Sequence, residues 1–193
     1  MTQLLTLQDD LKAAVDTLRR GGVIIYPTDT IWGIGCDATR PEAVSRIYEL
    51  KRRSDSKALI TLMADDRMLE RYVDDPPEVA LQLMELSEKP VTVIFDHATG
   101  LAPNLTAADG SLGVRIPRDD YASALCRMLR RPVVSTSANI SGMPAPATFA
   151  AIDPVLLDGA DYVACHRRTD TEAHVASSII KITGSGIFKL IRP

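Results

Sequence analysis

The stretch that decides the fold is residues 23–37, VIIYPTDTIWGIGCD. Its apolar opening, residues 23–25, predicts a buried strand, and the residues that follow are rich in hydroxyl groups and glycine. A second stretch, residues 132–142, repeats this design as PVVSTSANISG. Open α/β sheets bind their ligands where strands end. Core packing does not require so many Thr, Ser and Asn side chains, so the two strand ends predict a binding site.

The rest of the chain alternates irregularly between helical and strand patterns. Apolar spacing predicts a first helix over about 7–20, which the glycine pair at 21–22 ends. Thr39 and Glu42 have the spacing of a capping box, which predicts a helix running to about Lys51. Further helices are expected at 66–73, 77–87, 119–130 and 149–157, and strands at 58–63, 91–95, 113–116, 132–135, 162–165, 178–182 and 187–191. This pattern predicts an α/β fold with a twisted, mixed β-sheet flanked by helices.

Length and composition narrow the class of protein. A chain of 193 residues fits a single domain over 1–193, and 46% apolar residues can build a large core. A net charge of −3 argues against coating nucleic acid or membrane by bulk charge. Three cysteines without a CxxC pair argue against a disulfide framework or a structural zinc site. Without a signal peptide or an 18-residue apolar run, the expectation is a cytoplasmic protein with no membrane segment.

Cationic residues gather at two places. Lys51, Arg52, Arg53 and Lys57 follow a helix end, where they either complement the helix dipole in solvent or face a phosphate. Arg115 lies inside the apolar strand at 113–116, where it either meets an anion or is exposed at a sheet edge.

Neutral polar groups form the second kind of cluster. Ser135, Ser137 and Asn139 belong to a run of hydroxyls and an amide that either forms a turn after the strand or binds ribose, phosphate or carboxylate groups. Their number favours a ligand. The sequence lacks a P-loop, a complete dinucleotide fingerprint, an HExxH metal motif and a GxSxG elbow. Metal, hydride-transfer and serine-hydrolase chemistry are therefore disfavoured.

Taken together, these segments resemble the YrdC/TsaC family of threonylcarbamoyl-AMP synthases. The resemblance rests on six motifs in the family's order: PTDTxxGxG at 27–35, KxR at 51–53, GVRIP at 113–117, SAN at 137–139, SSII at 177–180 and RP at 192–193. The chain resembles the short, single-domain form of this family. This resemblance implies a YrdC-like fold with a concave basic cavity.

The resemblance also implies a reaction and its residues. L-threonine, bicarbonate or CO2, and ATP with Mg²⁺ would give threonylcarbamoyl-adenylate and pyrophosphate, without a protein nucleophile, while Lys51 and Arg53 compensate charge. A separate transferase would then modify the adenosine next to the anticodon of tRNA. The ATP-binding residues implied are Lys51, Arg53, Lys57, Ser111, Ser137, Asn139 and Arg192, and the threonine-binding residues are Thr30, Arg115, Ser135 and Ser177.

Some features depart from the family or leave alternatives open. Leu62 stands where many relatives have a histidine that reaches threonine, and the loop at 98–112 is the best candidate for a mobile lid. The alternative function is a non-catalytic module of the same fold that binds tRNA or rRNA; the scarcity of aromatic residues, 5%, counts against it. A relative that adenylates carbamate from another donor is a third reading.

Overall fold

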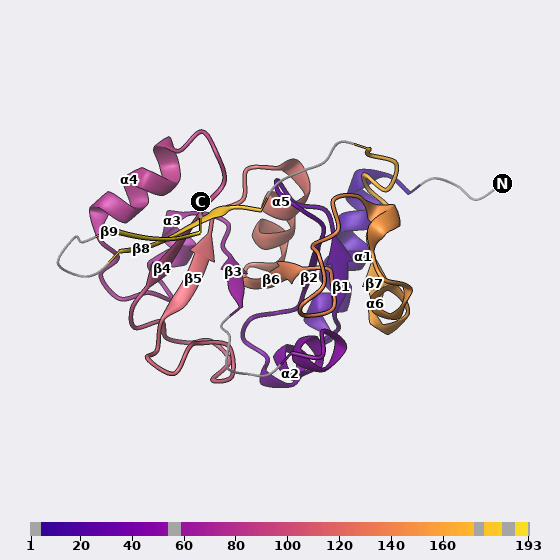
Figure 1. Cartoon of the computed structure of the whole chain (residues 1–193), viewed down its shortest axis with the longest axis horizontal. Helices are drawn as coiled ribbons and strands as arrows, with labels where there is room; N and C mark the ends of the chain where they lie inside the picture. The colour runs from indigo at the N-terminus through magenta and orange to yellow at the C-terminus, as the bar shows by residue number, and fades with distance from the viewer. Residues whose placement is uncertain (1–4, 54–58, 172–175, 183–187, 193) are drawn as a thin grey trace.

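One mixed sheet organises the molecule (Figure 1). The computed structural model describes residues 5–53, 59–171, 176–182 and 188–192. Within these ranges nine strands lie in the order β7-β1-β2-β6-β3-β5-β4-β8-β9. The strands are β1 (Ile24–Tyr26), β2 (Gly33–Gly35), β3 (Ile60–Leu62), β4 (Val91–Phe95), β5 (Leu112–Arg115), β6 (Val133–Ser137), β7 (Tyr162–Val163), β8 (Ser178–Ile182) and β9 (Phe188–Arg192). The pairs β1–β7, β3–β5 and β4–β8 are parallel and the other neighbours are antiparallel, so the predicted mixed sheet is confirmed.

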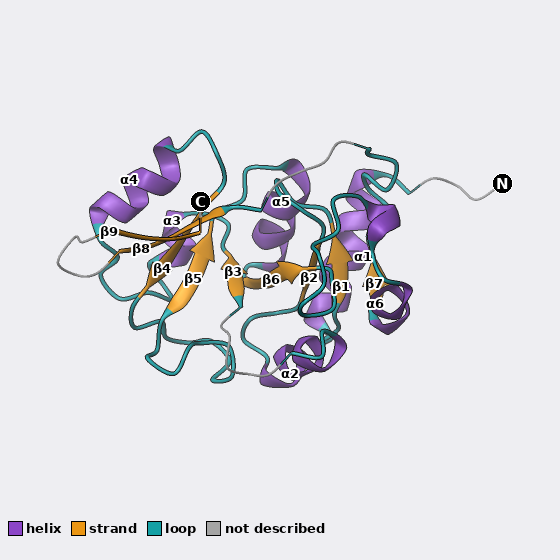
Figure 2. Cartoon of the chain, viewed as in Figure 1, coloured by secondary structure: helices purple, strands orange, loops and turns teal. Residues whose placement is uncertain are grey.

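Helices flank this sheet, as Figure 2 shows. They are α1 (Leu7–Arg19), α2 (Pro41–Leu50), α3 (Asp66–Leu69), α4 (Glu78–Leu86), α5 (Asp120–Leu129) and α6 (Pro154–Gly159), with a 3₁₀ turn at Phe149–Ala151. Helix α1 packs against α5, α4 against β4, and α2 against α6. None of the helices in the described part of the chain combines the length and apolarity that a bilayer-spanning segment needs. The described strands form one sheet; that residues 1–193 are a single domain stays a prediction.

The structure differs from the sequence-based prediction of the elements in three notable places. Residues 33–35 form a strand, β2, although two of the three are glycine, because they lie between β1 and β6. The capping box does not form: the Thr39 hydroxyl donates to Asp37 Oδ1 at 2.7 Å, and α2 begins after Arg40 without a side-chain cap. The helix expected at 149–157 is a 3₁₀ turn and a separate helix, α6, which Asp153 caps.

The loop at 98–112 is anchored to the body of the protein. The Ala102 amide donates to the Ala38 carbonyl at 2.9 Å, and Asn104 Nδ2 donates to the Pro41 carbonyl at 2.9 Å. Leu105 is completely buried. These contacts hold the loop beside the start of α2 and argue against the predicted mobile lid.

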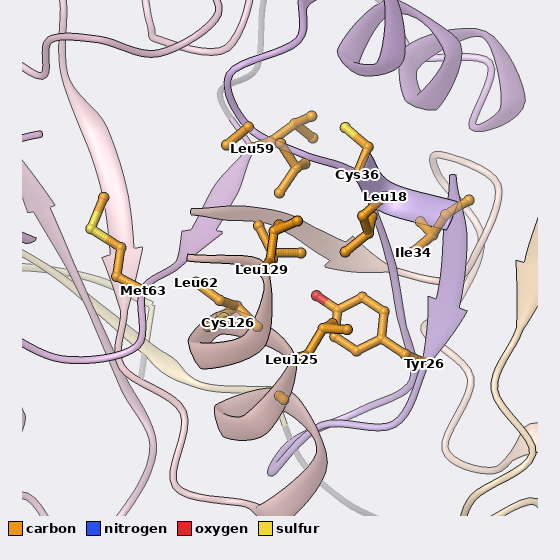
Figure 3. Close-up of a cluster of buried hydrophobic side chains, with 14 of the residues drawn as sticks. Leu18, Tyr26, Ile34, Cys36, Leu59, Leu62, Met63, Leu125, Cys126 and Leu129 are labelled. Carbon is orange, nitrogen blue, oxygen red and sulfur yellow. The ribbon is translucent and has the colours of Figure 1, made fainter. Parts of the chain in front are cut away.

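Aliphatic side chains of the sheet and of α5 form the core shown in Figure 3. Leu62, the residue in place of the family's histidine, is completely buried there, near Leu125 and Cys126. This position therefore contributes to packing under α5. The thiol of Cys126 is equally buried, and burial, followed by the charge of Asp119, raises its pKa.

This buried thiol predicts a loss of stability in alkali. Because the pKa of Cys126 is raised in the folded state, its thiol stays protonated there while the unfolded chain ionises, so stability is lost as pH rises above the ordinary value of 9.0. Between pH 8 and 10, the wild type should lose about 1 kcal/mol more of unfolding free energy than Cys126→Ala does. Urea denaturation at both pH values measures this difference. Cys165→Ala, which removes an exposed thiol, should follow the wild type, and a Cys126→Ala protein with the wild-type pH dependence would contradict the prediction.

Candidate functional site

A cavity of about 270 Å³ opens where the predicted strand ends meet. The turn between β1 and β2 contributes Thr28 and Thr30, and β5 contributes Arg115. The complete lining is Thr28, Thr30, Ile31, Gly33, Arg53, Leu59, Ile60, Arg115, Ser135, Thr136, Ser137, Ala145, Ala176, Ser177, Ile179 and Arg192. The structure therefore brings Arg53, Arg192 and all four predicted threonine-binding residues into one hollow.

Arg115 lines this cavity and is only 5% exposed. Its Nη1 donates to Thr30 Oγ1 at 2.9 Å, and its Nη2 lies 3.3 Å from Asp29 Oδ1. Asp29 in turn donates its backbone amide to Asp119 Oδ2 at 3.0 Å. Burial raises the pKa of Asp119, and the charge of Asp29 adds to this effect. Arg115 is thus a buried cation whose charge Asp29 partly offsets and whose guanidinium is fixed in direction by two partners.

Arg192 reaches the same cavity from β9. Its Nε and Nη2 donate to the Ser177 carbonyl at 3.0 and 2.7 Å, while the Ser177 hydroxyl pairs with Thr92 Oγ1 at 2.8 Å. Burial lowers the pKa of Arg192, and the positive charge of Arg115 lowers it further. Two guanidinium groups that repel each other at one cavity would be stabilised by an anion between them.

A second cavity, of about 320 Å³, adjoins the first and shares Arg53 and Ser137 with it. Its other lining residues are Lys51, Arg52, Asn139, Ser141 and Gly142. Asn139 Nδ2 donates to the carbonyls of Ile140 at 3.0 Å and Met143 at 2.6 Å, so the amide group is fixed by its own loop. Arg53, predicted to meet ATP phosphates, stands where both cavities meet, and burial lowers its pKa.

Lys51, predicted to compensate phosphate charge, lines the second cavity with most of its hydrogen-bonding capacity already used. Its side chain is 2% exposed, and Nζ donates to the carbonyls of Ser137 and, at 2.7 Å, of Asn139. Burial, with the charge of Arg53, lowers the pKa of Lys51 to about 8. An ammonium has three donors, so at most one remains for a ligand. The side chain joins the end of α2 to the end of β6 and so shapes the second cavity.

The remaining predicted residues lie elsewhere. Ser111 lines a neighbouring hollow of about 100 Å³, which shares Leu59, Ile60 and Ile179 with the first cavity. Lys57 lies outside the described residues. The carboxylate of Asp29 offsets part of the positive charge of Arg115. The predicted net positive charge of the cavity therefore stays a prediction. In the described ranges, no group of three His, Cys, Asp or Glu side chains is arranged to hold a metal ion.

Thr28 and Asp29 are further functional candidates. They belong to the motif at 27–35, but the sequence alone did not predict a ligand-binding role for either of them. They are the two residues before Thr30, and the contacts of Thr28 with Thr30 and of Asp29 with Arg115 appear only in the fold. Thr92 hydrogen-bonds to Ser177, but the sequence does not indicate this role, because Thr92 lies in an ordinary strand pattern. The signal that could have indicated Thr28 is its hydroxyl group, two residues before the predicted threonine-binding hydroxyl of Thr30.

Comparisons with known proteins agree with this geometry. Residues 16–193 match the sequence model of a family described as "Telomere recombination". The threonylcarbamoyl-AMP synthase of Xanthomonas campestris pv. campestris (strain B100) is 40% identical over 158 residues, which are 80% of this chain and 84% of that protein. The protein of the same name from Escherichia coli O6:H1 is 37% identical over 158 residues, or 77% of this chain and 83% of its own length.

Solved structures share the fold. The crystal structure of P. abyssi Sua5 complexed with L-threonine superposes with a TM-score of 0.84 at 26% identity, covering 98% of this chain. This chain spans 55% of that longer protein. E. coli YciO superposes with a TM-score of 0.81 at 25% identity, covering 97% of this chain and 89% of YciO.

Proposed function

Because this chain belongs to the Sua5–YciO–YrdC family, we propose that it is a threonylcarbamoyl-AMP synthase, which makes threonylcarbamoyl-adenylate and pyrophosphate from L-threonine, bicarbonate or CO2, and ATP. The observation that carries the proposal is the cavity at the strand ends, where Arg115 lies among the hydroxyls of Thr30, Ser135 and Ser177 and adjoins a second hollow next to Arg53. Relatives named as synthases disfavour the alternative of a non-catalytic RNA-binding module.

Positioning and charge compensation are sufficient for this chemistry. The neutral amine of threonine attacks CO2 and loses a proton, which gives a carbamate. A carbamate oxygen then attacks the α-phosphorus of ATP, and the bond to the β-phosphate oxygen breaks, releasing pyrophosphate. In this scheme Arg115 binds the carboxylate of threonine through two N–H groups, and Thr30, Ser135 and Ser177 contact the rest of the amino acid.

The nucleotide would occupy the second cavity and reach Arg192 in the first cavity and Ser111 in the neighbouring hollow. Arg53, Lys57 and Arg192 compensate the triphosphate charge, and Ser111, Ser137 and Asn139 contact neutral groups of ATP. Lys51 acts mainly by holding the end of β6. Among the described residues that line the two cavities, none carries a carboxylate, so the Mg²⁺ would be held by the phosphates of ATP and would offset their charge.

The product is a reactive mixed anhydride, so a transferase must consume it promptly. We propose that this step takes place on the adenosine next to the anticodon of tRNA and that the enzyme is cytoplasmic. We include in this proposal that the chain contacts tRNA.

Product formation tests the proposal directly. Purified protein with ATP, Mg²⁺, labelled bicarbonate and threonine should release pyrophosphate and give a labelled threonylcarbamoyl-adenylate in mass spectrometry. Omitting threonine should stop the release. Equal pyrophosphate release with serine, or without an amino acid, would contradict the assignment. Activity with carbamoyl phosphate in place of bicarbonate and threonine would favour the third reading, a carbamate-adenylating relative.

A further inference from the structure

The hydroxyl group of Thr30 has a fixed direction. The Thr28 hydroxyl donates to the Ile31 carbonyl at 2.8 Å, and a carbonyl can only accept. Since a hydroxyl has one proton, Thr28 has none left for Thr30, whose Oγ1 lies 2.9 Å from Thr28 Oγ1. Thr30 must therefore donate its own proton to Thr28.

The other side of Thr30 meets Arg115. Arg115 Nη1 donates to Thr30 Oγ1 at 2.9 Å, and this bond takes one of the two lone pairs of the hydroxyl oxygen. The hydroxyl then has one lone pair free and no proton to give. Towards a ligand in the cavity, Thr30 is an acceptor only.

Burial enforces this arrangement. Thr28 is 3% exposed and Thr30 is 4% exposed, and both line the cavity. The backbone amide of Thr30 also donates to Thr28 Oγ1, at 3.0 Å. Thr28 thus accepts two hydrogen bonds and donates one. Reversing the Thr28–Thr30 bond would take this donor away from the part-buried Ile31 carbonyl, which costs the free energy of one hydrogen bond.

We propose that Thr28 is a positioning residue that makes Thr30 the acceptor for the amino group of the amino-acid substrate, an inference that rests on the proposed function. An ammonium group only donates hydrogen bonds, so it suits an oxygen that has a lone pair and no proton to offer. A carboxylate only accepts, so it suits the adjacent Arg115. The ammonium and the carboxylate of an α-amino acid are attached to the same carbon atom. Their proposed partners, Thr30 Oγ1 and Arg115 Nη1, are likewise adjacent in the protein.

The same arrangement serves the proposed chemistry. Once the amine is neutral, its lone pair must point at CO2. An acceptor that holds one of the N–H groups orients the amine and leaves that lone pair free for the attack. If Thr30 could donate instead, it would bind the lone pair itself and oppose the reaction.

Two substitutions at Thr28 and two ligands test this inference by calorimetry. Thr28→Val keeps the shape of the side chain and removes its hydroxyl, whereas Thr28→Ser keeps the hydroxyl. Thr28→Val should raise the Kd for threonine about tenfold, while Thr28→Ser stays within about twofold of the wild type. The Kd for 3-hydroxybutanoate, which is threonine without its amino group, should be the same in all three proteins. The KM for ATP should not change.

Several outcomes would overturn the inference. They are an unchanged Kd for threonine in Thr28→Val, equal weakening of threonine and 3-hydroxybutanoate, and an equal defect in Thr28→Ser. If Thr28→Val does not fold, Thr28→Ala removes the same hydroxyl without adding a methyl group. Binding needs no turnover, so these results stay separate from the product assay: a wild type that binds threonine and makes no adenylate would overturn the proposed function alone.

Discussion

Arg115→Lys is expected to raise the KM for threonine about a hundredfold, because a lysine ammonium cannot reproduce the two parallel hydrogen bonds of a guanidinium to a carboxylate. The substitution keeps a positive charge near Asp29, which lies 3.3 Å from the Arg115 guanidinium, so this partly buried carboxylate keeps a partner and the fold is preserved. The KM for ATP should stay near the wild-type value, since Arg53 and Asn139 line the adjoining cavity. Steady-state kinetics with each substrate varied in turn measures both constants.

Arg118→Lys is the matched control. Arg118 lies three residues further along, and its Nη2 donates to the carbonyls of Met84 at 2.9 Å and Glu85 at 2.6 Å, away from the cavity. Its backbone contact with Asp29 does not depend on the side chain. This variant should keep the wild-type KM for threonine. An Arg115→Lys enzyme that saturates at wild-type threonine concentrations would remove Arg115 from the amino-acid site.

Local patterns were enough to predict most elements of the fold. The helix expected at 7–20 is α1, and the strands expected at 91–95 and 178–182 are β4 and β8 with the same limits. In each of these, apolar spacing and the contacts in the fold favour the same structure. By contrast, β2 could not be predicted because its glycines have low strand propensity, and only the approach of β1 and β6 makes them a strand.

The site was predicted by resemblance to a family, and the structure adds what the resemblance lacks. It brings Thr30, Arg115 and Arg192 to one cavity, although they come from three separate parts of the sheet. Their roles towards threonine and ATP stay predictions. Lys51 shows the limit of the sequence: its two partners are backbone carbonyls of a segment more than eighty residues away, which no pattern of side chains encodes.

Among the strand glycines Gly33, Gly35 and Gly113, Gly35→Ala is expected to cause the largest loss of stability. A Cβ at this position would lie 2.1 Å from the Val134 carbonyl oxygen and 3.0 Å from Tyr26 Cε1. The oxygen belongs to the backbone of β6, so the clash is relieved only if β2 and β6 move apart. We expect the free energy of unfolding to fall by about 3 kcal/mol or more, measured by urea denaturation.

Gly113→Ala is the control within the same sheet. There the added Cβ would meet Thr92 Cγ2 at 3.4 Å, an ordinary contact with a side chain, so the loss should be below about 1 kcal/mol. Equal urea midpoints for the two variants would contradict the argument from the Val134 carbonyl. The separation of β2 from β6 would also reach the cavity, because Gly33 on β2 pairs with Ser137 on β6 and both line it. Gly35→Ala should therefore weaken threonine binding even at temperatures where the variant remains folded, since close packing of two backbones sets the width of the site.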